Sequence, residues 1–84
     1  MTTPRVLIID DDELVAATLH AMAEAVGAEA HATSDSDSFF AALEQWQPTH
    51  ILLDLNMPNL DGMEVIAELA NRGVEAGIIV VSGV

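Results

Sequence analysis

Three short apolar runs that lack polar alternation constrain the fold of this chain most strongly. They are RVLII at residues 5–9, HILLDL at 50–55 and GIIVVS at 77–82. A strand can be apolar at successive positions only when both of its faces are buried, as in a parallel sheet that helices cover on both sides. A partly alternating run at residues 28–33 predicts a further strand.

Apolar residues at helical spacing fill the segments between these runs. Residues 12–26 have acids in the first turn and Gly27 just after the last, which predicts a helix that ends there. The sequence SDSD at 34–37 fits a capping box with Ser34 as the N-cap, opening a helix that runs to about residue 45. A third amphipathic helix follows Gly62 and stops at Gly73. The apolar stripes of the three helices are Val15, Leu19, Met22, Ala23 and Val26 in the first, Phe39, Phe40 and Leu43 in the second, and Met63, Ile66, Leu69 and Ala70 in the third.

The alternation of strands and helices predicts the fold class. Strands joined through helices of this length form right-handed βαβ units, which build a parallel sheet with helices on both faces. With 84 residues, the chain is expected to form a single α/β domain over residues 1–84.

The charge and composition limit the partners and the location. Fourteen acids against two basic residues give a net charge of −12, which argues against nucleic acid and anionic membranes and favours cations and basic partners. The chain has no cysteine, and its first residues, MTTPR, do not resemble a secretory signal. No apolar segment approaches the ~18 residues that a membrane span needs. We therefore expect a cytoplasmic protein.

Carboxylates stand where two of the predicted strands end. Asp10 and Asp11 follow the first strand, and Asp54 lies near the end of the third. Ligands of an open parallel sheet bind beyond the carboxyl ends of its strands, where the strand order reverses. Carboxylates gathered there raise one another's pKa unless a cation compensates, and oxygen ligands of this kind suit Mg²⁺ completed by a phosphate. A carboxylate beside Mg²⁺ can also attack phosphorus and form an aspartyl phosphate.

Each of these features has a structural explanation when it is taken alone. Acids at a helix start often only cap the helix, and the MPNLDG sequence at 57–62 is typical of a tight turn. A hydroxyl at a strand end, such as Ser82, is most often simply hydrogen-bonded. All of these features are predicted to share one edge of the sheet, however, and this coincidence favours a functional site.

The sequences VLIIDDDE, ILLDLNMPNLDGMEVI and IIVVSG, in this order and spacing, resemble the receiver domain of two-component response regulators. The resemblance implies a flavodoxin-like sheet with strand order 2-1-3-4 for the strands present. It implies that Asp54 is the phosphoacceptor and that a histidine kinase or a histidine phosphotransfer protein is the phosphodonor. It further implies that Mg²⁺ is held directly by Asp11 and Asp54, by Asp10 largely through water, and by the backbone carbonyl of Asn56. Ser82 would take the place of the hydroxyl that bonds the phosphoryl group.

The same resemblance implies segments that the 84 residues do not contain. Receiver domains continue into a fourth helix, a fifth strand ending in lysine, and a fifth helix, whereas this chain has no lysine. We therefore expect a receiver that is incomplete at its carboxyl end. Without the lysine, phosphorylation is expected to be slow or short-lived, because loss of such an electrostatic contact commonly costs about 10²-fold or more in rate. The strand at 77–82 would be an apolar edge, which predicts self-association.

Three functions remain open from the sequence. The first is a phosphoacceptor module that is not an enzyme acting on other substrates. The second is a non-catalytic interaction or oligomerisation module with a degenerate acid pocket. The third, a Mg²⁺-dependent phosphohydrolase, is disfavoured because such enzymes need an acid two residues after the nucleophile, where this chain has Asn56.

Overall fold

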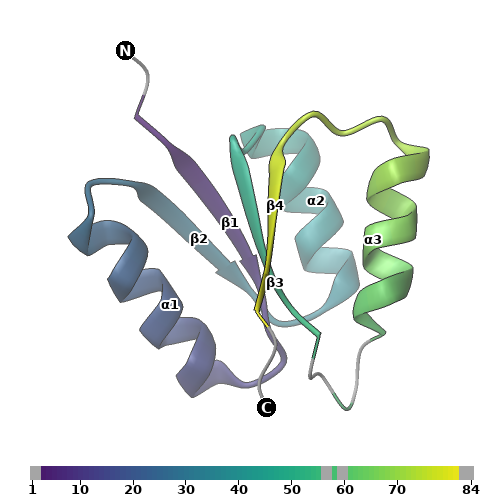
Figure 1. Cartoon of the computed structure of the whole chain (residues 1–84). Helices are drawn as coiled ribbons and strands as arrows, with labels where there is room; N and C mark the ends of the chain where they lie inside the picture. Colours follow the sequence, from purple (N-terminus) through teal and green to yellow (C-terminus); the bar gives the residue numbers. More distant parts are fainter. Residues whose placement is uncertain (1–2, 56–57, 59–60, 82–84) are drawn as a thin grey trace.

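The chain folds into a four-stranded parallel sheet with helices on both faces (Figure 1). The computed structural model describes residues 3–55, 58 and 61–81. The strands are β1 (Arg5–Ile9), β2 (Glu29–Thr33), β3 (His50–Asp54) and β4 (Gly77–Val81). The helices are α1 (Glu13–Ala25), α2 (Ser36–Trp46) and α3 (Gly62–Asn71). Every predicted element is present, with ends that differ from the predicted ones by up to two residues.

The strand order is β2-β1-β3-β4, and all neighbouring strands are parallel. Ile9 pairs with Thr33 of β2 and with Leu53 of β3, so the carboxyl ends of these strands lie within one residue of one another. Asp54 pairs in turn with Val81 of β4. The carboxyl ends of the strands therefore meet at one edge of the sheet, and the predicted fold class is confirmed.

One face of the sheet is closed by α2 and α3. The core on this face joins side chains of β1 and β3 to side chains of the two helices, and all of them are buried. Fully burying one such side chain contributes about 1.5–3 kcal/mol relative to leaving it exposed. The members of this core are Leu7, Ile9, Ile51, Leu53, Phe39, Leu43, Val65 and Leu69.

The other face is covered only in part, by α1. This helix packs on β1 and β2, and Ala16 is its only buried residue. Three members of its predicted apolar stripe stay exposed: Val15 at 37%, Met22 at 60% and Val26 at 84%. Helical spacing thus predicted the helix correctly, but most of its apolar stripe does not enter the core.

The fourth strand departs from the sequence prediction. Its apolar run predicted burial on both faces, but Ile78, Ile79 and Val80 are 40%, 49% and 43% exposed. The reason is position: β4 is an edge strand, and it pairs only with β3 among the described residues. An unpaired apolar edge offers backbone groups to another strand.

The start of α2 also differs from the prediction. The N-cap is Asp35 rather than Ser34, and its Oδ1 accepts a 2.7 Å hydrogen bond from the backbone N–H of Ser38. The Ser38 hydroxyl donates to the other carboxylate oxygen of Asp35 at 3.1 Å. Asp and Ser are about equally good N-caps, so the residue type alone does not select one of the two. In α3, Val65 and Leu69 form the buried face, whereas the predicted Met63 is 63% exposed.

Candidate functional site

Two predicted site residues are buried at the ends of neighbouring strands. Asp10 directly follows β1 and is fully buried, and Asp54 is the last residue of β3 and is 9% exposed. Asp11, the next residue after Asp10, is half-buried. Because β1 and β3 are parallel neighbours, the fold brings these acids to the same edge of the sheet, at the bottom of Figure 1.

The carboxyl group of Asp10 is only partly satisfied by hydrogen bonds. Its Oδ1 accepts a 3.0 Å bond from the backbone N–H of Asp12. Its Oδ2 is buried and has no hydrogen-bond partner among the described atoms when the group is ionised. A buried carboxylate oxygen without a donor is costly, so this atom marks the place where a cation would be most stabilising.

The electrostatics of the site agree with this geometry. Burial raises the pKa of the Asp10 carboxyl, and the bond from the Asp12 N–H offsets part of that rise. The negative charge of Asp54 raises the pKa further, as does a hydrogen bond between the two carboxyl groups, which exists only while they share a proton. Asp11 adds a smaller repulsion. This edge of the sheet is therefore strongly electronegative.

The acids at residues 10–12 do not all have the same role, because Asp12 caps a helix and the other two do not. Asp12 is the N-cap of α1, and its Oδ1 accepts from the backbone N–H groups of Leu14 at 2.9 Å and Val15 at 3.3 Å. The capping explanation therefore holds for Asp12, but neither Asp10 nor Asp11 is a cap. Asp61 caps α3 in the same way, which assigns a structural role to the last acid of the MPNLDG sequence.

Sequence reasoning missed Thr33, the last residue of β2. Its side chain is buried, and its hydroxyl donates to the backbone carbonyl of Ile8 at 2.6 Å. Its own carbonyl accepts the backbone N–H of Asp10 at 3.1 Å. The available signal was a β-branched hydroxyl residue at the carboxyl end of a strand that adjoins the first one.

Two predicted site residues, Asn56 and Ser82, lie outside the described residues. Within residues 3–55, 58 and 61–81, no group of three or more His, Asp or Glu side chains is arranged to hold a metal ion. The donor set nevertheless fits a hard cation, since it consists of carboxylate oxygens and includes the partnerless Oδ2 of Asp10.

The chain belongs to the response regulator receiver family, whose family model matches residues 6–84. A curated relative, the transcriptional regulatory protein PrrA of Mycobacterium tuberculosis, is 34% identical over 82 residues, which cover 98% of this chain. The matched segment is 35% of that protein's length, so the chain spans about a third of this relative.

Solved structures agree with this assignment. The signal receiver domain of a response regulator from Bermanella marisrubri is 29% identical, with a TM-score of 0.89 over 99% of this chain and 71% of that one. A response regulator from Burkholderia pseudomallei, solved with a phosphorylated aspartic acid, a calcium ion and citrate, is 28% identical, with a TM-score of 0.85 over 96% of this chain and 48% of that one. In the part of the chain that the structure describes, no helix is long and apolar enough to cross a membrane.

Proposed function

We propose that this domain is a phosphoacceptor of a two-component phosphorelay and that Asp54 is its phosphorylation site. The observation that carries the proposal is the convergence of buried Asp10 and Asp54 at adjacent strand ends, with a partnerless oxygen on Asp10. Family membership supports it, as does the phosphorylated aspartic acid in the Burkholderia pseudomallei relative.

The reaction assigns a separate task to each acid. A carboxylate oxygen of Asp54 attacks the phosphorus of a phosphohistidine, the P–N bond breaks, and the imidazole leaves with its electron pair and takes up a proton. Asp10 and Asp11 supply the negative charge that attracts the cation. Mg²⁺ held by Asp11, Asp54, the Asn56 carbonyl and, through water, Asp10 would neutralise charge that develops on the phosphoryl oxygens. The Ser82 hydroxyl is proposed to bond the phosphoryl group afterwards.

The proposed donor is a histidine kinase or a histidine phosphotransfer protein, acting in the cytoplasm. A net charge of −12 favours a donor with a basic docking surface and raises the rate of its encounter with this domain. The domain turns over only its own phosphoryl group, so we do not class it as an enzyme.

The test is phosphorylation by a small donor such as acetyl phosphate, followed by intact-protein mass spectrometry. We expect addition of one phosphoryl group that requires Mg²⁺ and disappears in Asp54→Asn. Asp61→Asn is the matched control, because Asn replaces Asp well as an N-cap and labelling should persist. Labelling that survives in Asp54→Asn would contradict the assignment, and steady turnover of a phosphate ester would favour a phosphohydrolase.

A second candidate function, self-association, is favoured by the exposure of β4. Ile78 and Val80 lie on the α2–α3 face, opposite Ile51 and Leu53, whereas Ile79 lies on the α1 face, opposite Leu52. All three β4 side chains are exposed, so the edge is apolar on both faces. We propose that two copies of the 84-residue chain pair along this edge.

Sedimentation over a range of concentrations tests this pairing. We expect a dimer that Ile79→Lys dissociates, because the charge would be buried between the copies. Met22→Lys on α1 is the control, since Met22 is at least as exposed but lies away from the edge. A chain that stays monomeric at every concentration would exclude the pairing.

A further inference from the structure

We propose that Thr33 is a positioning residue of the candidate site: its hydroxyl fixes the carboxyl end of β1 and thereby the placement of Asp10 and Asp11. The inference rests on the proposed function, because it concerns how these acids are held for Mg²⁺. Thr33 itself is not proposed as a ligand.

Thr33 forms hydrogen bonds with the backbone of β1 on both sides of Ile9, the last residue of that strand. The hydroxyl donates to the carbonyl of Ile8 at 2.6 Å, and the carbonyl of Thr33 accepts the N–H of Asp10 at 3.1 Å. Ile9, the residue between them, pairs with Thr33 in the sheet. The peptide groups that lead into Asp10 are therefore tied to β2 by a side chain as well as by the backbone ladder.

The hydrogen bond of the Thr33 hydroxyl is shielded from water. Thr33 is 6% exposed and Asp10 is fully buried, so water does not compete for the hydroxyl or for the Ile8 carbonyl. From Asp10 the chain continues to Asp12, whose N–H bonds the Asp10 Oδ1 at 3.0 Å and leaves Oδ2 without a partner. A shift at the end of β1 would therefore move the oxygen that is best placed to receive a cation. Displacements of about 0.5 to 1 Å are enough to weaken metal and catalytic sites.

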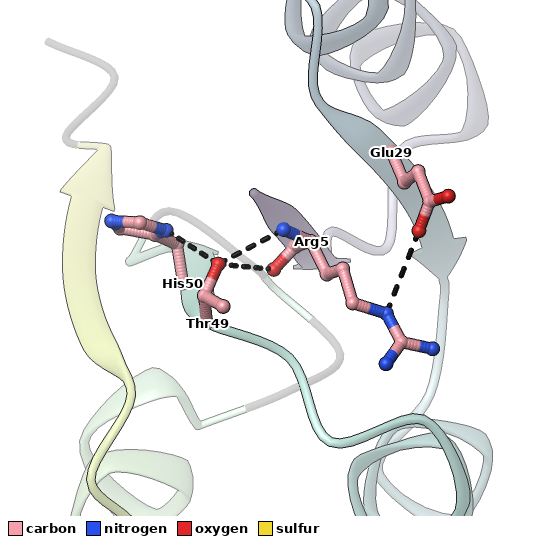
Figure 2. Close-up of polar contacts among 4 residues, drawn as sticks. All are labelled: Arg5, Glu29, Thr49 and His50. Atoms are coloured by element: carbon pink, nitrogen blue, oxygen red, sulfur yellow. Dashed lines mark hydrogen bonds and ion pairs between the residues drawn. The ribbon is translucent and has the colours of Figure 1, made fainter. Parts of the chain in front are cut away.

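A second threonine, Thr49, forms hydrogen bonds with the opposite end of β1. The Thr49 hydroxyl accepts from the backbone N–H of Arg5 at 2.9 Å and lies 3.2 Å from the Arg5 carbonyl (Figure 2). It also lies 2.8 Å from Nδ1 of His50, so its one proton serves either the carbonyl or the ring. Thr49 thus provides the same kind of side-chain contact to β1, at the end remote from the acids.

The two threonines, one at each end of β1, allow a controlled Mg²⁺-binding experiment. Mg²⁺ alone is titrated into the full 84-residue chain and followed by the backbone amide signals of Asp11 and Asp12 in NMR spectra. We expect Thr33→Val to weaken the apparent Kd for Mg²⁺ by about tenfold, whereas Thr33→Ser, which keeps the hydroxyl, should remain within about twofold of the parent chain. The Asp12 amide signal should shift in Thr33→Val even without Mg²⁺, because its bond to Asp10 is displaced.

Thr49→Val is the matched control. It removes a hydroxyl that bonds the backbone of β1 at its other end, although Thr49 is exposed where Thr33 is buried. It should lower the melting temperature but leave the Kd for Mg²⁺ within about twofold of the parent. Equal weakening of Mg²⁺ binding in Thr33→Val and Thr49→Val would overturn the inference, because it would reflect general loosening of β1. An unchanged Kd in Thr33→Val would overturn it as well.

Two further outcomes separate this inference from the proposed function. If the parent chain bound no Mg²⁺, the metal site of the proposed function would be wrong and the inference would fall with it. Thr33→Ala provides a second variant in case Thr33→Val does not fold. If both are unfolded while Thr33→Ser folds, the hydroxyl supports the whole sheet, and the assignment as a positioning residue is overturned.

Discussion

On one face of the sheet, α2 and α3 enclose a core in which Phe39 and Ile51 are fully buried and Leu69 is nearly so. On the other face, α1 buries only Ala16 of its own residues and leaves Met22 and the C-cap residue Val26 exposed. Both helical layers contain apolar stripes of similar length in the sequence. The difference shows that an apolar stripe predicts a helix, but that the amount of its buried area depends on what lies beside it.

The same contrast bears on the site. Side chains of β1 and β3 alternate between the two faces, and the last one of each strand to enter the α2–α3 core comes directly before an acid: Ile9 precedes Asp10, and Leu53 precedes Asp54. The closed face therefore holds both strand ends in place. We infer that mutations on this face disturb the site and that mutations on the α1 face do so much less.

The largest expected effect is that of Phe39→Ala. Phe39 is fully buried in the α2–α3 core, and its loss leaves a cavity, so the free energy of unfolding should fall by about 3–5 kcal/mol. In a domain of this size such a loss can abolish folding. Urea denaturation measures it, and a loss below about 1 kcal/mol would mean that the core is not closed as described.

A smaller effect of opposite sign is expected for Asp10→Asn. Burial raises the pKa of Asp10 in the folded state above its ordinary value of 3.8, so ionisation of this group opposes folding. The cost is absent below that value, grows as the pH rises towards the folded-state pKa, and is complete above it. Asn keeps the oxygen that accepts the Asp12 N–H bond but carries no charge.

Asp10→Asn should therefore melt at a higher temperature than the parent at pH 7 in the presence of EDTA. The difference should shrink as the pH falls and vanish near pH 3 to 4, the region of the ordinary value of 3.8. A gain that persists unchanged at acid pH would show that charge is not its cause. The removal of divalent cations matters because a bound cation would reverse the sign of the effect.

Gly27→Ala and Gly73→Ala test one helix end on each face of the sheet. Gly27 follows the C-cap of α1 with φ of 88°, and Gly73 follows the C-cap of α3 with φ of 66°. Alanine in this left-handed region costs about 1 kcal/mol or slightly more. Because the strain is local, both variants should lose similar stability in urea denaturation, even though one helix is on the closed face and the other is not.

The smallest expected effect is that of Met22→Ala. Met22 is 60% exposed on α1, so its truncation should change the free energy of unfolding by no more than about 0.5 kcal/mol. Measured beside Phe39→Ala, it compares one apolar helix residue from each layer. A loss above about 2 kcal/mol would show that the α1 face is as well packed as the other.

Much of the fold could be read from the sequence. The runs at β1 and β3 predicted buried parallel strands because apolar residues follow one another without alternation at 6–9 and 51–53, and both strands are present. Gly27 and Gly73 were predicted to end α1 and α3, and both adopt the left-handed conformation that glycine permits at lowest cost. These features depend on neighbours within a few residues, which the sequence displays directly.

The errors of the sequence prediction have a common cause. The composition of β4 resembles that of β3, but β4 lies at the edge of the sheet, so Val80 is exposed whereas Leu53, its partner in β3, is buried. Asp35 rather than Ser34 caps α2, because both are competent caps and the path of the chain out of β2 decides between them. Local sequence cannot report which strand has a neighbour or which of two caps is in reach.

For the site, the identity of the acids and their positions at strand ends follow from the sequence: Asp10 and Asp11 after β1, and Asp54 at the end of β3. The pairing of β1 with β3, the full burial of Asp10 with one partnerless oxygen, and the bond from Thr33 to β1 depend on the folded chain. They do so because Thr33 and Ile8 are 25 residues apart, and the hydrogen bond between them exists only once the strands are paired.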